Sequence, residues 1–200
     1  MPRFKTEPFA HQLAEVDEHW STPYRCLWWE QGTGKTKAII DTAAALYRDG
    51  KIDAVFIIAP GGVHDNWIRD EIPAHMPDEI PIMTHAYQTK TQGTKRFQTY
   101  APTLLEFEGL AVLAMTFDSI MTQKKKGVKK IKYKDYRRLL NGTPVIDSPM
   151  HAYSQVKWAN PEIWESIGIR AFQHYKVMFG LWQQQQLGNG RSFPQLLRYC

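Results

Sequence analysis

Seven residues decide the fold of this chain: Glu30-Gln31-Gly32-Thr33-Gly34-Lys35-Thr36. Before them lies the short apolar and aromatic run of residues 25–29, which predicts a buried strand. After them, residues 36–48 show helical spacing with many alanines, and Gly50 follows as a helix-ending residue. Glycines between a strand and a helix let the backbone curl, so that successive N–H groups face inward at the helix N-terminus. The stretch therefore predicts a phosphate-binding loop.

Two side chains of the loop suit a nucleotide triphosphate. Lys35 would place a positive charge at the terminal phosphates, and the hydroxyl of Thr36 would coordinate magnesium. The strict loop pattern has glycine where this chain has Trp29, and Gly32 stands two residues before Gly34 instead. A chance Gly-Lys-Thr turn in a surface loop is the alternative, which the flanking strand and helix disfavour. The residues expected to bind ATP here are Gln31, Gly32, Thr33, Gly34, Lys35 and Thr36.

Apolar runs alternate with helical segments along the rest of the chain. Residues 54–59 are wholly apolar between Asp53 and Pro60, which is typical of a strand buried on both faces of a parallel sheet. This alternation predicts an α/β fold with a largely parallel sheet. Beyond Pro149 the chain is expected to be mainly helical. Further expected elements are a helix from about residue 9 to 20, a helix at 63–72, and strands at 80–83, 110–115 and 136–140.

In order along the chain, several segments resemble the first RecA-like domain of superfamily-two helicases, and among them the Swi/Snf-type double-stranded DNA translocases, including phage-borne members. The resemblance covers about residues 4–199 and implies a three-layer fold, use of ATP and magnesium, and sequence-independent binding of duplex DNA. Pro8-Phe9-Ala10-His11-Gln12 resembles the motif whose glutamine reads adenine, here Gln12, and residues 30–36 resemble motif I. The resemblance implies that two motifs face DNA: motif Ia, with Pro60, Gly61, Asn66 and Trp67, and motif Ib, with Thr116 and Asp118. It also implies that motif III couples ATP to DNA, through Gly142, Thr143 and Pro144.

Taken alone, each of these residues also has a structural interpretation. Gln12 could be an ordinary surface residue of an amphipathic helix, and Trp67 could be a core anchor. Asn66 and Thr116 could cap or turn the chain. Their order and spacing relative to Lys35 favour the functional interpretation.

The chain departs from this family in the region that should hold motif II. In the family an apolar strand there ends in Asp-Glu, which holds magnesium and polarises the attacking water. The interval from Thr116 to Thr143 is rich in lysine and contains no apolar strand; its acidic residues are Asp118 and Asp135. Asn141 also stands where the family has threonine. We therefore expect an incomplete fold, with residues 1–147 as the ATP-binding domain, a deletion at about 124–135, and residues 148–200 as a helical extension towards an absent second RecA-like domain.

Charge and composition set the remaining expectations. The net charge is +5, and nine basic residues fall between Lys124 and Arg138, which is typical of a solvated loop or of a patch that binds the DNA backbone. No apolar run is long enough to span a membrane. The two cysteines, Cys26 and Cys200, argue against a disulfide framework, so the expected location is the cytoplasm of a bacterium or a phage-infected cell.

Three functions remain open from the sequence. The first is a Swi/Snf-type helicase or translocase domain that hydrolyses ATP negligibly by itself. The second is a non-catalytic ATP- and DNA-binding module that modulates a full-length relative. The third is another phosphate-loop enzyme such as a kinase, which would need an acidic strand end and a substrate lid that the sequence does not offer.

Overall fold

The computed structural model describes residues 3–87, 106–116, 136–142, 150–186 and 192–199. The chain divides into two compact units. Unit 1 comprises Met1–Thr22 and Gly34–Lys134, and unit 2 comprises Pro23–Thr33 and Asp135–Cys200. The domain boundary near residue 147 stays a prediction.

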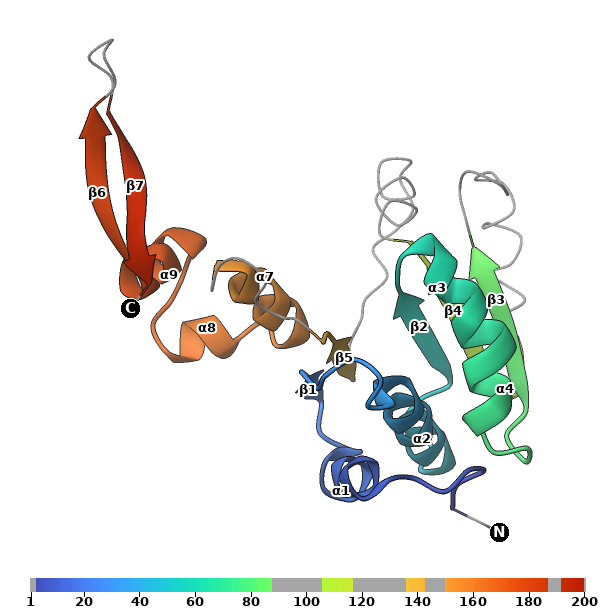
Figure 1. Cartoon of the computed structure of the whole chain (residues 1–200). Helices are drawn as coiled ribbons and strands as arrows, with labels where there is room; N and C mark the ends of the chain where they lie inside the picture. The colour runs from blue at the N-terminus through green and yellow to red at the C-terminus, as the bar shows by residue number, and fades with distance from the viewer. Residues whose placement is uncertain (1–2, 88–105, 117–135, 143–149, 187–191, 200) are drawn as a thin grey trace. The chain divides into compact units, whose positions relative to one another are not determined.

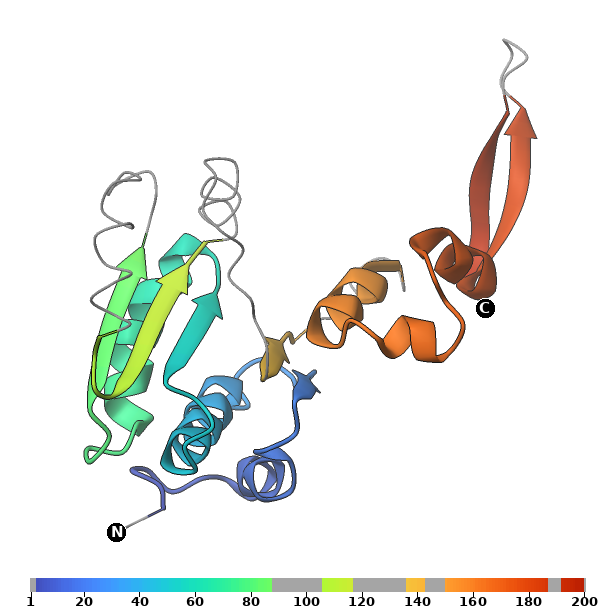
Figure 2. The same ribbon diagram turned by 180° about the vertical axis from the view of Figure 1, so that it is seen from behind.

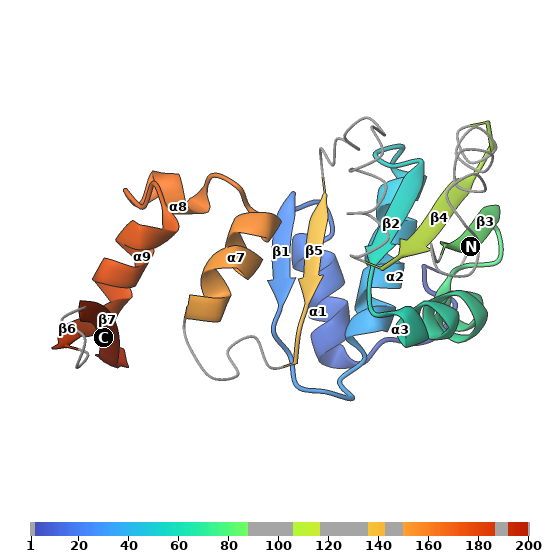
Figure 3. The same cartoon turned by 90° about the horizontal axis from the view of Figure 1, so that it is seen from above.

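Unit 1 is built on a three-stranded parallel sheet. The strands are β2 (Ala54–Ile58), β3 (Ile82–Tyr87) and β4 (Leu110–Met115), in the order β2-β4-β3 (Figure 3). The central strand β4 is buried at every position except the half-buried Leu113, because it is apolar throughout and has a neighbour on both sides. The α/β class and the parallel sheet predicted from the sequence are confirmed.

Backbone hydrogen bonds fix which side of each strand faces β4. The amide of Ala111 donates to Asp53 O at 3.0 Å, and the amide of Ala59 donates to Met115 O at 3.1 Å. On the other side, the amide of Leu110 donates to Pro81 O at 2.8 Å. Successive residues of a strand alternate in direction, so odd-numbered residues of β4 bond to β2 and even-numbered ones to β3.

Helices pack on this sheet and on one another. Helix α1 (Ala10–His19) contacts α2 (Lys35–Arg48), whose buried face is rich in alanine and isoleucine. A continuous helical segment follows β2 and lies over one face of the sheet (Figures 1 and 2). It consists of α3 (Gly61–Asp65), the π-helical turn η1 (Asn66–Glu71) and α4 (Ile72–His75).

The π-helical turn has a cause in the sequence. The amide of Ile72 donates to Trp67 O, five residues back, which is the π-helical pattern. Pro73 has no N–H to donate, and its ring would clash with the carbonyl four residues back in an α-helix. The wider turn removes that clash, so the helix passes the proline and ends at His75 rather than at the predicted residue 72.

Unit 2 contains a two-stranded parallel sheet of β1 (Tyr24–Leu27) and β5 (Arg137–Leu140). The sequence suggests that residues 136–140 could take the place of the missing motif II strand. In the structure they pair with β1, the strand that precedes the phosphate loop. Helix α7 (Met150–Ala159) contacts both strands. Beyond it lie α8 (Ile163–Ser166) and α9 (Phe172–Phe179).

Aromatic side chains form the core around α7, α8 and α9. The rings of Tyr153 and Trp164 stack with centroids 5.5 Å apart, and Tyr175 packs against both. Trp164 Nε1 also donates to Tyr153 O at 2.9 Å. Burial raises the pKa of the Tyr175 hydroxyl. The predicted helical extension is confirmed for this part of the chain.

The same prediction is wrong for residues 180–199. Within this range the described residues form two antiparallel strands, β6 (Gly180–Gln186) and β7 (Ser192–Tyr199). Gly180 has an extended backbone, with φ −141° and ψ 135°, so it ends α9 and starts the strand. Cross-strand pairing from Gly180↔Tyr199 to Gln186↔Ser192 then stabilises β structure in a glutamine-rich stretch with little strand propensity of its own.

Candidate nucleotide-binding loop and neighbouring motifs

The backbone of the candidate loop bends sharply at two glycines. Gly32 and Gly34 have φ values of 78° and 73°, in the left-handed region that glycine adopts without strain. Gly34 is the N-cap of α2, and its carbonyl accepts the amide of Ala38 at 3.3 Å. The helix therefore starts at Lys35 and presents the amides of its first turn at the loop, where they favour an anion.

The division between the two units falls inside the loop, after Thr33, so each half is described with its own unit. In unit 2, Thr33 Oγ1 donates to Glu30 O at 2.7 Å and closes a tight turn. In unit 1, the side chains of Lys35 and Thr36 are half-buried at the helix start. The predicted contacts of Lys35 with phosphates and of Thr36 with magnesium stay predictions.

Gln12 lies against the start of α2. Its side-chain nitrogen Nε2 donates to Gly34 O at 3.2 Å, and its Oε1 accepts the amide of Phe9 at 2.9 Å. Gln12 is 1% exposed, so it is a buried residue of α1 and not a surface residue of an amphipathic helix. One side chain thus caps α1 and contacts the N-cap of α2. Its predicted reading of adenine stays a prediction.

An exposed aromatic residue stands next to this contact. Phe9 is 69% exposed, and its ring stacks on the His11 ring with centroids 6.0 Å apart. The Gln12–Phe9 hydrogen bond holds this pair at the N-terminus of α1. Neither Phe9 nor His11 has a role of its own that the sequence predicts.

The motif Ia residues follow β2. Pro60 is exposed and caps α3, Gly61 is half-buried, and Asn66 is exposed with its Nδ2 at 3.5 Å from Glu71 Oε1. Trp67 is 9% exposed, so it packs into unit 1, and Asn66 is the neighbour that presents its side chain to solvent.

A buried histidine that the sequence did not single out holds this turn. His64 is 0% exposed, and its Nε2 donates to Ala59 O at 2.8 Å. Its Nδ1 has no hydrogen-bond partner within the described part of the chain. Because the acceptor is the last carbonyl before Pro60, the bond fixes the path from β2 into α3. No sequence signal marks His64, since a histidine in a helix is usually exposed.

A buried ion pair lies one turn into α2. Lys37 Nζ and Asp41 Oδ2 are 2.5 Å apart, and their side chains are 8% and 0% exposed. Burial raises the pKa of the Asp41 carboxyl, although the hydrogen bond from Lys37 opposes the rise. Lys37 also lies 5.5 Å from the centroid of the Phe4 ring. Spacing of four residues on a helix permits such a pair, but it does not predict burial.

The described part of motif III contacts the loop within unit 2. The amide of Asn141 donates to Leu27 O at 3.2 Å, and its Nδ2 donates to Gln155 Oε1 on α7 at 3.1 Å. A Cβ atom on Gly142 would lie 3.0 Å from Gln31 Cγ and 3.6 Å from Trp29 O. The structure therefore places Gly142 beside Gln31, and the coupling role of Gly142 stays a prediction.

Several predicted residues lie outside the described residues. Asp118, Thr143 and Pro144 fall outside them, as does the basic run up to residue 135. Thr116 is half-buried directly after β4. Arg137 and Arg138, the described end of the basic run, donate to backbone carbonyls: Arg137 Nη1 to Trp158 O at 2.9 Å and Arg138 Nη1 to Pro23 O at 3.3 Å.

Two negative findings apply to the described residues. They include no group of three or more His, Cys, Asp or Glu side chains that would hold a metal ion. None of their helices is both long enough and apolar enough to cross a membrane.

Comparisons with known proteins agree on the fold. The chain matches no protein-family model and no curated protein. Among solved structures, it is similar to the Sulfolobus solfataricus SWI2/SNF2 ATPase core in complex with dsDNA, with a TM-score of 0.62 and 15% identity over 88% of this chain and 40% of that chain. It is also similar to a nuclease-deletion mutant of the Type ISP restriction-modification enzyme LlaGI in complex with a DNA substrate mimic, with a TM-score of 0.55 and 15% identity over 70% of this chain and 18% of that chain. The chain thus spans less than half of either neighbour, and at this identity the likeness shows a partial RecA-like fold.

Proposed function

We propose that this chain is the ATP-binding part of a Swi/Snf-type DNA translocase. The observation that carries the proposal is the start of α2, where a left-handed Gly34, hydrogen-bonded by buried Gln12, presents Lys35 and Thr36 at a helix N-terminus. The fold likeness to an ATPase core supports it. So does the order of the motif-like segments along the chain.

In this proposal each residue of the loop has a separate task. The first amides of α2 bind phosphate oxygens, and Lys35 neutralises the terminal phosphates. The Thr36 hydroxyl supplies one oxygen ligand to magnesium, which in such sites screens phosphate charge. Gln12 holds Gly34 in position. Gly142 contacts Gln31 and so links motif III to the loop.

Hydrolysis by the chain alone is proposed to be negligible. Activation of water needs a carboxylate near the terminal phosphate. The described residues include no group of three or more His, Cys, Asp or Glu side chains that could hold a metal ion, and the sequence between Thr116 and Thr143 lacks an Asp-Glu strand. The missing motif II is therefore part of the proposal.

Duplex DNA is the proposed second ligand, bound without sequence preference in the cytoplasm of a bacterium or a phage-infected cell. Support comes from the solved neighbours, which are complexes with DNA or a DNA substrate mimic, and from the net charge of +5. Exposed Asn66 and Pro60 and half-buried Thr116 would lie on the DNA side. A non-catalytic module that binds both ligands is the second candidate, which the lack of an apolar Asp-Glu strand between Thr116 and Thr143 favours.

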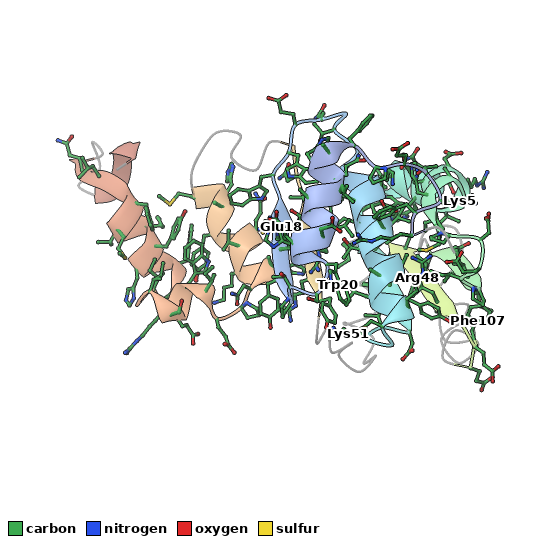
Figure 4. All side chains as sticks on the ribbon, turned by 90° about the horizontal axis from the view of Figure 1, so that it is seen from below. Lys5, Glu18, Trp20, Arg48, Lys51 and Phe107 are labelled. Carbon is green, nitrogen blue, oxygen red and sulfur yellow. The ribbon has the colours of Figure 1, made fainter. Side chains whose placement is uncertain are left out.

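A titration with a fluorescent ATP analogue tests the nucleotide site. We expect saturable, magnesium-dependent binding that Lys35→Ala weakens by about tenfold or more, since one charge-assisted contact is worth about 1.5–3 kcal/mol. Lys51→Ala is the matched control (Figure 4). Its ammonium lies 2.8 Å from Asp49 and 4.5 Å from the Trp20 ring centroid, beyond the C-terminal end of α2. Equal loss in both variants would contradict the proposal.

A salt titration tests the DNA site. We expect binding of unrelated duplexes with similar affinity and a steep fall as salt rises, because phosphate contacts release counterions. Binding that ignores salt would overturn the DNA part of the proposal. Turnover that DNA stimulates and Lys35→Ala abolishes would show that the chain is catalytic by itself.

A further inference from the structure

Residues 3–6, which we call the clasp, run across the helices of unit 1. The carbonyl of Arg3 accepts a hydrogen bond from Arg48 Nη1 at 2.8 Å, at the C-terminal end of α2. Lys37 Nζ, nearer the start of the same helix, lies 5.5 Å from the centroid of the Phe4 ring, which is a cation–π distance. The first half of the clasp is therefore held on α2, the helix that begins at the candidate phosphate loop.

The second half of the clasp caps α4. Lys5 Nζ donates to Pro73 O at 2.8 Å and lies 2.5 Å from Asp78 Oδ1 (Figure 4). The Pro73 carbonyl cannot accept the usual helical bond from four residues further on, because Pro77 has no N–H. Lys5 supplies that donor, and its positive charge is favourable at the C-terminal end of a helix. The clasp thus joins α4 to α2.

From α4, polar contacts continue to Asn66, which is proposed to face DNA. Thr6 Oγ1 and His75 Nδ1 are hydrogen-bonded at 2.7 Å. On the other side of the ring, His75 Nε2 lies 3.7 Å from Glu71 Oε2, and Glu71 Oε1 accepts a hydrogen bond from Asn66 Nδ2 at 3.5 Å. Asn66 and Glu71 are five residues apart, a separation that the π-helical turn brings to one side of the helix. Two side chains therefore connect Thr6 with Asn66.

The same stretch of chain also reaches the phosphate loop. Shortly after Thr6, Gln12 Nε2 donates to Gly34 O at 3.2 Å. A change in the backbone at Gly34 consequently has a short, continuous path through Gln12 and the clasp to His75. Every residue of this path belongs to unit 1.

We propose that the clasp couples the two ligands: nucleotide at the start of α2 shifts the clasp, and the clasp sets the orientation of Asn66 towards DNA. Thr6 is the positioning residue of this link, because its hydroxyl joins the clasp to His75. The clasp can shift without unfolding unit 1, since Lys5 and Asp78 are 30% and 82% exposed and such ion pairs are weak. This inference rests on the proposed function, which places ATP at the loop and DNA beside Asn66.

Two substitutions of Thr6 test this inference. Thr6→Val keeps the shape of the side chain and removes the hydrogen bond to His75, whereas Thr6→Ser keeps the hydroxyl. The Kd for a labelled DNA duplex is measured with and without a non-hydrolysable ATP analogue and magnesium. We expect the analogue to change this Kd by about fivefold or more in the unmodified chain and in Thr6→Ser, and by less than about twofold in Thr6→Val. Affinity for the analogue without DNA should be the same in all three, because Thr6 does not belong to the loop.

Arg3→Met is the matched control within the clasp. The Arg3 side chain pairs with Asp17 of α1, so its removal leaves the contacts of Lys5 and Thr6 with α4 in place. The coupling factor should therefore stay unchanged. Reciprocity gives a second check, since DNA must change the affinity for the analogue by the same factor. Circular dichroism checks that each variant is folded.

Hydrogen exchange tests the clasp without any ligand. The amide of Met76 donates to Ile72 O at 2.9 Å, at the end of α4 that the clasp caps. Its exchange should be about threefold faster or more in Thr6→Val and unchanged in Thr6→Ser, because local opening is easier once the bond to His75 is lost.

The outcomes separate this inference from the proposed function. Equal Met76 exchange in the two variants, equal coupling in the two variants, or no coupling in the unmodified chain overturns the inference while the proposed function stands. Failure of the analogue or of DNA to bind the unmodified chain overturns the proposed function and the coupling with it. The Met76 exchange reports in either case whether Thr6 holds α4.

Discussion

Gln12 Nε2 fills the space next to Gly34 where a side chain would otherwise lie. It donates to Gly34 O at 3.2 Å, and a Cβ atom on Gly34 would be 2.2 Å from it. The two residues are 22 positions apart, and the contact ties the N-terminus of α1 to the N-terminus of α2. Glycine is therefore required at position 34 for its backbone conformation and for this close approach.

Alanine substitutions at the two loop glycines should separate these requirements. Both have positive φ, so Gly32→Ala and Gly34→Ala each incur a left-handed backbone cost of about 1–2 kcal/mol. Only Gly34→Ala also displaces Gln12, which adds about 1 kcal/mol for a lost hydrogen bond, because a Cβ on Gly32 has no atom within 4 Å. Urea unfolding measures the difference. Equal costs at the two positions would refute the close contact.

A double variant supplies the control for that experiment. Gln12→Ala removes the atom that a new methyl group at position 34 would displace. The free-energy costs of Gln12→Ala and Gly34→Ala should therefore be less than additive when the two are combined, whereas Gln12→Ala with Gly32→Ala should be additive.

Gln12→Ala should lower the affinity for ATP and for GTP by the same factor. Both ends of the Gln12 amide bond to the protein, so its effect on nucleotide binding passes through Gly34 and the loop. Competition against a fluorescent ATP analogue measures both affinities. A loss confined to ATP would show instead that Gln12 reads adenine, as the sequence resemblance implies.

Breaking the ion pair between Lys37 and Asp41 should be costly, whereas removing both charges should not. Asp41→Asn leaves the Lys37 ammonium buried without its carboxylate, which typically costs about 3–5 kcal/mol. The double variant Lys37→Met, Asp41→Leu should lie within about 1 kcal/mol of the unmodified chain or be more stable. Thermal and urea unfolding test this, and a double variant as unstable as Asp41→Asn would contradict it.

Alkylation should report the environment of Cys26. Burial raises the pKa of this thiol, and the nearby Arg25 only partly opposes the rise. A raised pKa means less thiolate at any pH below it, so iodoacetamide should react more slowly than with a free thiol, and the rate should rise at a higher pH. The measurement uses Cys200→Ser, which leaves one cysteine. In urea, Cys26 of the same variant should react at the rate of a free thiol. If Cys26 of the folded chain reacted at that rate too, its burial would be contradicted.

Local elements were predictable because their signals are local. The strand at 110–115 was predicted with its observed bounds, and the helix at 36–48 and the strand at 54–59 each differ from the structure by one residue. The partner of each strand was not predictable, since apolar composition does not say which edge a strand joins. The pairings of β5 with β1 and of β6 with β7 were missed for this reason.

The candidate site was predictable where glycine and charge dominate, and not where burial does. Gly32 and Gly34 lie in the left-handed region and α2 begins at Lys35, as the predicted order of glycine-rich loop and helix expects. The burial of Gln12 and of His64 depends on which helices pack around them, and nothing in their neighbours along the chain encodes that packing.

The π-helical turn gives the segment from Gly61 to His75 an unusual tolerance for changes in length. It contains one residue more than an α-helix needs to cover the same path. Deleting one residue between Asn66 and Glu71, together with Pro73→Ala, would let the turn close as an α-helix while His64 and Ile72 keep their directions. The α-helical segment Gly61–Asp65 contains no extra residue, so a deletion there would rotate His64 away from Ala59. Natural variation in chain length is therefore expected in the π-helical turn before it is expected anywhere else in this segment.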